Sequence, residues 1–282
     1  MANATRNDAC PVRPHPRRVR LHCWPSRRAR RTRIVDRIVT PVTDDRRGNR
    51  ALIRWAYRRL LEHYGRPTWE ATYAPVDELI GTILSQHTSD LNSQRAFDSL
   101  TRTFSSWEAV RDAAVDELIH AIRTGGLGVV KAHRIQAVLR ALTDADGGVR
   151  LPDLRRMRRK RAVDLLTGLP GVGRKTAACV LLFGSHVPAI PVDTHVHRVS
   201  LRVGLVPPRT NPEATTDALE AALDAPDHYA FHVNVIRLGR EICKAPRPRC
   251  DVCPLRERCH FARQSPINSH VGLRTRTPRS RR

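Results

Sequence analysis

Long apolar runs are missing from this sequence of 282 residues. No apolar segment of the signal-peptide type stands near the N-terminus. The best candidate for a membrane helix, residues 177–192, is short and is interrupted by His186, Pro188 and Pro191. Because a membrane-spanning helix needs about 20 mostly apolar residues, we expect a soluble intracellular protein, located in the cytoplasm, with no membrane partner.

Acidic residues and lysines are both scarce. The chain has 27 Asp and Glu against 50 Lys and Arg, which gives a formal net charge of +23. A chain this basic indicates a polyanionic partner, most often nucleic acid. Nearly all of the cations are arginines, so any lysine in a distinctive context stands out. The lysines are Lys131, Lys160, Lys175 and Lys244.

The seven cysteines are too unevenly spread for a secreted disulfide framework. Cys10 and Cys23 lie apart from the rest, and we assign Cys179 to the apolar core. Four thiols in one short segment predict a metal site in a reducing compartment. From ligand chemistry alone, either a Cys₄ zinc site or an iron–sulfur cluster is possible, and zinc is favoured because zinc sites are common. These four cysteines, with six, two and five residues between them, are Cys243, Cys250, Cys253 and Cys259.

Apolar residues recur at helical spacing through most of the chain, and no alternating strand pattern is present. Helix-start signals agree with this: Pro75 suits a first turn, Ser89 suits an N-cap, and residues 105–108 have the form of a capping box. We therefore predict an all-α fold. The expected helices lie at about 51–64, 75–84, 90–100, 115–122, 127–142 and 229–242, with others starting after Ser106 and Asn211.

The two ends of the chain lack this pattern. Residues 1–48 are dominated by Arg and Pro, and residues 264–282 are basic with Pro and Ser. Such compositions predict disordered basic segments. The N-terminal arm either holds nucleic acid non-specifically or derives from an upstream reading frame, and we expect it to be dispensable.

The most informative segment is Leu169–Ala177, with the sequence LPGVGRKTA and an apolar run on each side. Pro170 opens a turn, and Gly171 and Gly173 permit backbone geometry that a side chain would block. We predict a helix, a tight hairpin and a second helix whose first N–H groups suit one phosphate. On the two glycines alone, an ordinary helix–helix turn is an equal alternative.

This segment, followed by Val192-Asp193-Thr194-His195, resembles the helix-hairpin-helix (HhH-GPD) DNA glycosylases of the endonuclease III family. The resemblance covers about residues 50–261. It implies a base-excision repair enzyme that acts on double-stranded DNA carrying a damaged base or an abasic site. We expect a monomer associated with the nucleoid.

The resemblance also implies two helical lobes with DNA across the cleft between them. One lobe comprises residues 49–69 plus 187–263 and carries the cysteine loop. The other, residues 70–186, is a six-helix unit that includes the helix-hairpin-helix motif at 163–184.

The resemblance assigns the chemistry to Lys175 and Asp193. Lys175 matches the family's Schiff-base lysine, whose amine attacks C1′ of the damaged nucleotide and expels the base. The amine must be partly neutral, a state favoured by burial, by the neighbouring Arg174 and by a helix N-terminus. Asp193 matches the family's activating carboxylate, and it also suits an N-cap. Taken alone, Lys175 would more often be a phosphate-binding lysine on a solvated face.

With both residues present, we expect a bifunctional glycosylase and AP lyase that removes oxidised pyrimidines. A monofunctional or mismatch-directed glycosylase and a non-catalytic DNA-binding protein are the alternatives. Adenine glycosylases carry a Glu where this chain has Gly81 or Thr82, which argues against that branch. His195 and His197 are poorly spaced to share a metal, so we expect structural or DNA-facing roles.

The remaining expected contacts are with DNA and with a cofactor. The family's side chain that fills the gap left by a flipped base matches Gln86 or His87. The hairpin contributes Gly171, Gly173 and Arg174, and the first interval of the cysteine loop contributes Lys244, Arg247 and Arg249. The cysteine spacing is that of the endonuclease III loop, so the resemblance replaces zinc by a [4Fe-4S] cluster with a structural role.

Overall fold

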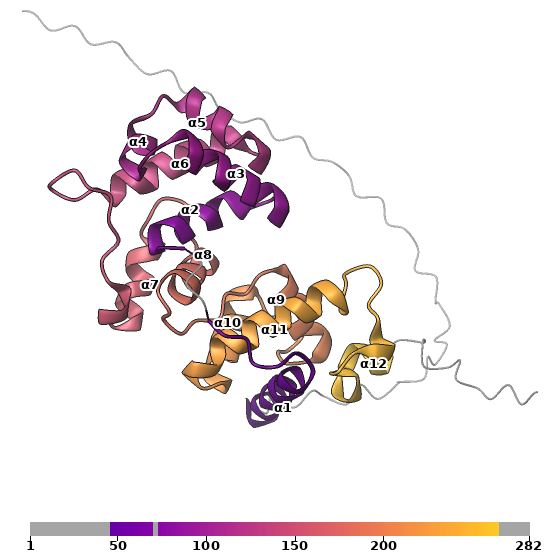
Figure 1. The fold of residues 1–282 in the computed structure, drawn as a ribbon. Helices are drawn as coiled ribbons and strands as arrows, with labels where there is room; N and C mark the ends of the chain where they lie inside the picture. The colour runs from indigo at the N-terminus through magenta and orange to yellow at the C-terminus, as the bar shows by residue number, and fades with distance from the viewer. Residues whose placement is uncertain (1–45, 70–72, 265–282) are drawn as a thin grey trace, which may run out of the picture. The chain divides into compact units, whose positions relative to one another are not determined.

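The computed structural model describes residues 46–69 and 73–264, with side chains from residue 49 onward (Figure 1). The predicted N-terminal arm up to residue 45, with Cys10 and Cys23, lies outside these residues, and so does the predicted tail from residue 265. The first helix begins at Arg46, so the last residues of the predicted arm are helical.

The described residues form helices joined by turns and loops, and they contain no sheet, which confirms the all-α prediction. Within them, no helix combines the length and apolar character that crossing a lipid bilayer requires. The helices are α1 (Arg46–Tyr64), α2 (Pro75–Ser85), α3 (Asp90–Thr103), α4 (Trp107–Asp112), α5 (Val115–Ala121), α6 (Gly128–Ala141), α7 (Arg159–Thr167), α8 (Arg174–Cys179), the π-helical η3 (Val180–Gly184), α9 (Thr194–Val203), α10 (Pro212–Ala222), α11 (His228–Glu241) and α12 (His260–Gln264).

Capping side chains start several helices where the sequence predicts a start. Ser89 accepts a hydrogen bond from the backbone N–H of Asn92 (3.3 Å), and Asn211 accepts one from Ala214 (2.8 Å). Pro75 occupies the first turn of α2. Each cap pairs an N–H group that the helix itself leaves without a partner.

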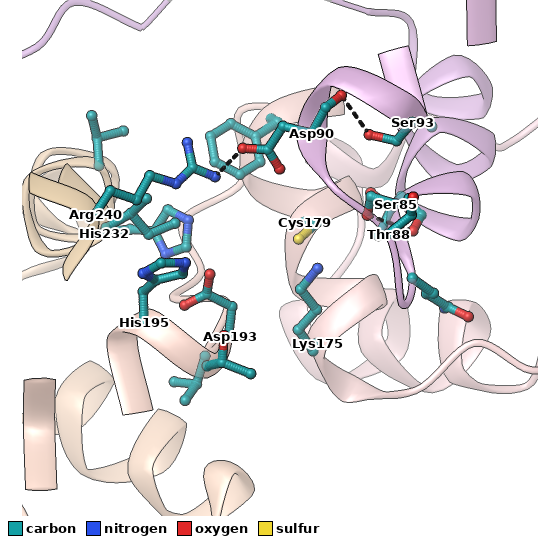
Figure 2. Close-up of a pocket in the computed structure, with 18 of the residues that line it drawn as sticks. Ser85, Thr88, Asp90, Ser93, Lys175, Cys179, Asp193, His195, His232 and Arg240 are labelled. Atoms are coloured by element: carbon teal, nitrogen blue, oxygen red, sulfur yellow. Dashed lines mark hydrogen bonds and ion pairs between the residues drawn. The ribbon is translucent and has the colours of Figure 1, made fainter. Parts of the chain in front are cut away.

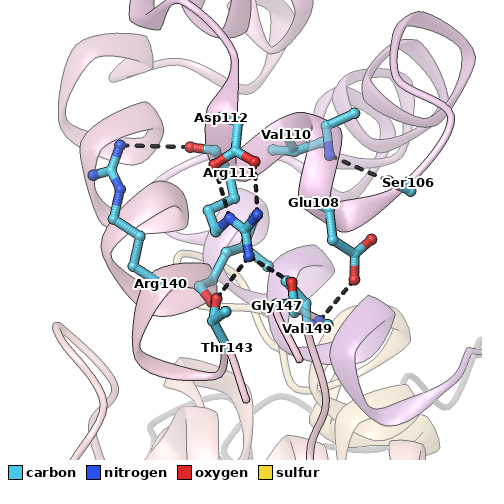
Figure 3. Close-up of polar contacts among 12 residues, drawn as sticks. Ser106, Glu108, Val110, Arg111, Asp112, Arg140, Thr143, Gly147 and Val149 are labelled. Atoms are coloured by element: carbon cyan, nitrogen blue, oxygen red, sulfur yellow. Dashed lines mark hydrogen bonds and ion pairs between the residues drawn. The ribbon is translucent and has the colours of Figure 1, made fainter. Parts of the chain in front are cut away.

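The capping box predicted for α4 is wrong (Figure 3). Ser106 caps the helix, but the Glu108 carboxylate accepts from the backbone N–H of Val149, 2.7 Å away. Arg111 of the same helix donates to the Gly147 carbonyl oxygen (2.8 Å). These side chains fasten α4 to the turn after α6, a partner too distant in sequence for a local pattern to indicate.

Buried apolar side chains form two clusters. The first draws on α2 to α8 and η3 and ends at Ala189; the second begins again at Ile190 and draws on α1 and α9 to α12. The change from one cluster to the other, between Ala189 and Ile190, falls three residues after the boundary expected at residue 186. The division into two lobes stays a proposal.

The helix-hairpin-helix forms as predicted, with α7 and α8 on either side of the turn. Gly171 has φ +71°, and a Cβ there would lie 2.3 Å from Nε of Arg134, so this position requires glycine. Gly173 has φ −90°, and nothing lies within 4 Å of a Cβ built on it. The prediction that the backbone geometry at Gly173 excludes a side chain is therefore wrong: the conformation and the surrounding protein atoms both allow one.

Candidate active site

A cavity of about 1280 Å³ is lined by residues of α2, α3, α8, α9 and α11 (Figure 2). Lys175 and Asp193 both line it, although they lie on different helices. Gln86 and His87 also line it, at the end of α2. The cavity therefore brings together four of the residues singled out from sequence.

Lys175 occupies the first turn of α8, and its ammonium group is directed toward the neighbourhood of Cys179 (Figure 2). The lysine side chain is exposed, so the burial expected for it is not observed. The adjacent Arg174 forms an ion pair with Asp217 of α10, Nη2 to Oδ1 2.5 Å. This pair partly neutralises the cation that was expected to act on Lys175.

Asp193 is the N-cap of α9, as predicted. Its Oδ1 accepts from the backbone N–H of Val196 at 2.7 Å, and its carboxylate faces the same space as the Lys175 ammonium (Figure 2). Capping uses one carboxylate oxygen. The second carboxylate oxygen can therefore accept a hydrogen bond or a proton from a substrate or from Lys175.

Glu78 of α2 is a cavity residue that the sequence reasoning missed. Glu78, Gly81, Thr82 and Ser85 all line the cavity, and their spacing of three, four and seven residues places them on one helical face. The Thr82 hydroxyl donates to Oε1 of Glu78 at 3.1 Å. Burial raises the pKa of Glu78 to about 7, although the Thr82 hydrogen bond and the positive charge of Lys175 act in the opposite direction.

Two further buried groups lie in the cavity wall. His232 of α11 is 2% exposed, and its Nδ1 has no hydrogen-bond partner among the described residues. Burial lowers the pKa of His232, against the opposing charge of Asp193. Burial raises the pKa of the Cys179 thiol to about 11, which keeps it protonated at neutral pH. Cys179 is thus buried, as predicted.

The two histidines after Asp193 have different surroundings. His197 Nε2 lies 2.8 Å from the Thr210 carbonyl oxygen, a contact that ties α9 to the turn before α10. His195 has Nδ1 3.2 Å from Nη2 of Arg198. Both histidines line the cavity, so both positions suit a contact with a ligand.

Gln86 and His87 also differ in their surroundings. The amide oxygen of Gln86 accepts from Nη1 of Arg134 at 2.5 Å, and Gln86 is half-buried. His87 is exposed and has φ +54°, a left-handed conformation that is uncommon for a residue with a side chain. Arg134, which also passes close to Gly171, connects the end of α2 to the hairpin and was not anticipated from sequence.

The four clustered cysteines line one small pocket, together with Arg202 and Phe261. Nη1 of Arg202 lies 3.6 Å from Sγ of Cys243. Among the described residues, no group of three or more His, Cys, Asp or Glu side chains is close enough to hold a single metal ion. The thiols therefore share one space but do not converge on one point.

The basic segment beside the cysteines is held by Arg202 of α9. Its guanidinium donates to the carbonyl oxygens of Lys244 (2.8 Å) and Ala245 (2.7 Å). The side chains of Lys244, Arg247 and Arg249 are exposed. This arrangement fixes the backbone and leaves three cations at the surface.

Comparison with known proteins agrees with this geometry. The family model described as HhH-GPD superfamily base excision DNA repair protein matches residues 80–224. Endonuclease III of Thermotoga maritima is 38% identical over 190 residues, which are 67% of this chain and 84% of that protein. Endonuclease III of Sulfolobus acidocaldarius is 31% identical over 185 residues, which are 65% of this chain and 80% of that protein.

Solved structures show the same similarity. A non-covalent endonuclease III–DNA complex matches with a TM-score of 0.68 and 30% identity, over 76% of this chain and 96% of that one. A trapped endonuclease III–DNA covalent intermediate matches with a TM-score of 0.67, also at 30% identity, over 76% of this chain and 97% of that one. The chain therefore belongs to the HhH-GPD superfamily of base excision DNA repair proteins and is a DNA glycosylase of the endonuclease III family.

Proposed function

We propose that this protein is a bifunctional DNA N-glycosylase and AP lyase that removes oxidised pyrimidines from duplex DNA. The observation that carries the proposal is the shared cavity of Lys175 and Asp193, an amine and a carboxylate that approach one space from different helices. A similar chain, at 30% identity, has been trapped as a covalent DNA intermediate.

In the proposed reaction, the neutral amine of Lys175 attacks C1′ of the damaged nucleotide and the C1′–N bond to the base breaks. The sugar then opens to an iminium ion on Lys175, and β-elimination breaks the strand on the 3′ side. Asp193 takes the proton from the amine and stabilises the positive charge that develops on the sugar. The exposed position of Lys175 leaves the desolvation of its amine to the bound DNA.

We propose that DNA contacts the hairpin through the backbone around Gly171 and Gly173 and through Arg174. The open space beside Gly173 suits the approach of a phosphate. We assign the side chain that fills the flipped-out base's place to His87, because it is exposed while the amide oxygen of Gln86 is held by Arg134.

We propose that the exposed cations Lys244, Arg247 and Arg249 neutralise phosphates on the same duplex.

We also propose that Cys243, Cys250, Cys253 and Cys259 hold a [4Fe-4S] cluster. All four are free thiols that line one pocket, and Nη1 of Arg202 lies 3.6 Å from Sγ of Cys243. A single zinc ion needs all four sulfurs about 2.3 Å from one point, whereas a cluster of several metal atoms spreads its ligands more widely. When bound, the cluster acts as a covalent brace for the loop between α11 and α12.

The test is a nicking assay on duplexes that carry an abasic site or thymine glycol, with borohydride in a parallel reaction. The proposal predicts strand cleavage and a covalent protein–DNA adduct. Base release with neither nick nor adduct would indicate a monofunctional glycosylase. Binding without any reaction, even after alkali treatment, would indicate a non-catalytic DNA-binding protein.

A further inference from the structure

We propose that Glu78 is a general acid of the active site, which donates a proton to the base as the base leaves. This inference rests on the proposed glycosylase function and adds a third reacting side chain to Lys175 and Asp193. The sequence gives no motif for it, because Glu78 lies inside a helix whose other residues are mostly apolar.

The geometry places the Glu78 carboxyl group in the cavity. The opposite face of α2 is fully buried in the core through Leu79, Ile80 and Ile83, so the helix cannot rotate without exposing that face. Glu78 therefore stays on the cavity face, with Thr82 fixing Oε1 through its hydroxyl.

The stem of Glu78 is also confined. A Cβ placed on Gly184, at the end of η3, would lie 3.1 Å from Cβ of Glu78. The backbone of η3 thus packs directly against this side chain. The Glu78 side chain is therefore restrained at Cβ by η3 and at Oε1 by Thr82. Its second oxygen, Oε2, is the one that can transfer a proton to a ligand.

The protonation state suits an acid that works at neutral pH. Burial raises the pKa of Glu78 to about 7, so both protonation states are well populated there. Lys175 is the cation that acts on Glu78 across the cavity. The other titratable or charged residues that line the same cavity are Tyr73 and His87 on either side of α2, Asp90 on α3, Cys179 on α8, Asp193, His195 and His197 at the start of α9, and His232, Arg237, Arg240 and Glu241 on α11. Asp90 forms an ion pair with Arg240. Lys131 and Arg134 on α6 donate to the Leu84 carbonyl oxygen and to Gln86.

The proposed step is balanced in protons and electrons. The Lys175 nitrogen forms a bond to C1′ while the C1′–N bond breaks, and its electron pair goes to the base. The base takes the proton of Glu78, which becomes a carboxylate. The attacking nitrogen, now bonded to C1′, releases a proton to Asp193, and transfer of this proton from Asp193 to the Glu78 carboxylate restores the acid. The suitable substrates are bases that present a ring nitrogen or a carbonyl oxygen to α2.

The test compares two rate constants under single-turnover conditions for the wild-type chain and Glu78→Gln. One is base release from duplexes that carry thymine glycol or another oxidised pyrimidine, measured after alkali. The other is nicking of a duplex with a preformed abasic site, measured without alkali. Because the abasic duplex has no base to protonate, the ratio of the two rate constants isolates the acid step from the amine chemistry that both share.

We expect Glu78→Gln to lower this ratio by roughly 100-fold and to change abasic-site nicking by less than about threefold. In the wild type the ratio should fall as the pH rises above about 7, since the acid form is then lost. The ratio should be independent of pH in the variant. Glu117→Gln on α5 is the matched control, because Glu117 is exposed and lies outside the cavity lining.

An unchanged ratio would overturn the inference, and so would an equal loss on both duplexes, which would mean a structural role or a role in the shared amine step. A wild type that nicks abasic sites but releases no base would also overturn it. A wild type that releases base but does not nick would contradict the lyase instead. In that case, slower base release by Glu78→Gln than by the wild type would still support Glu78 as the general acid, because base release is the step that the acid assists.

Discussion

Arg240 of α11 and Asp90 of α3 form an ion pair, Nη2 to Oδ2 2.6 Å, across the candidate active site (Figure 2). The two helices contribute to different apolar clusters, so the pair joins the two halves of the described fold beside the cavity. Both side chains are at least half exposed. An exposed pair contributes only about 0–1 kcal/mol to stability, so we expect a DNA phosphate to compete with Asp90 for Arg240.

The first prediction concerns this pair. Asp90→Asn removes the internal partner of Arg240, so an abasic-site duplex should bind several-fold more tightly. The dependence of affinity on salt should steepen by about one phosphate contact. Fluorescence titrations at several salt concentrations measure both quantities. Asp112→Asn is the control, since it removes a carboxylate from an ion pair on α4, outside the cavity; equal behaviour of the two variants would refute a local effect.

The second prediction separates the two roles of Asp193. Asparagine is also a good N-cap, so Asp193→Asn should change the free energy of unfolding by less than about 1 kcal/mol. Base release and nicking should nevertheless fall roughly 100-fold, since the proton acceptor is lost. Ser106→Ala is the converse control: it removes the cap of α4, which costs about 1 kcal/mol, and should leave activity unchanged. Full activity in Asp193→Asn would show that Asp193 acts only as the N-cap of α9 and has no catalytic role.

The third prediction concerns Lys131, which is 2% exposed. Its ammonium donates to the carbonyl oxygens of Leu84 and Gly125, each at 2.7 Å, and so ties the end of α2 to the turn before α6. Lys131→Met leaves both buried acceptors without that donor and should lower the free energy of unfolding by about 1–3 kcal/mol. Denaturant titration measures this. Lys160→Met, on an exposed side chain, should stay within about 0.5 kcal/mol.

The fourth prediction concerns the cysteine loop. Protein purified without oxygen should be brown and contain iron and acid-labile sulfide in equal amounts. Cys253→Ser should lower the iron content and the thermal stability together, because the loop then loses a ligand. Colourless protein with one zinc per chain would contradict the cluster and restore the zinc alternative.

Local patterns were sufficient to predict most of the helices and most of their starts, although α12 (His260–Gln264) was missed, because the helix at 229–242 was expected to be the last. Apolar spacing and caps such as Ser89 and Asn211 act within one or two turns, so the sequence alone contains the necessary information. The hairpin was predictable for the same reason, because Pro170 and Gly171 specify a turn between two apolar runs.

The parts that escaped prediction depend on distant partners. Glu108 fits a local capping box, but its carboxylate binds Val149 instead. The position of Glu78 in the cavity wall depends on the packing of α8 and η3 against α2, which no local sequence pattern indicates. Arg202, one arginine among many in the sequence, anchors the basic segment only because α9 passes beside the cysteine loop.

The most direct test of the proposed mechanism is borohydride trapping of an abasic-site duplex by the wild type and by Lys175→Ala. The proposed mechanism predicts a covalent adduct with the wild type, at least 1000-fold less with the variant, and duplex binding retained within several-fold. Lys160→Ala, which removes an exposed lysine of α7, should trap as well as the wild type. An undiminished adduct with Lys175→Ala would show that another amine is the nucleophile and would contradict the mechanism.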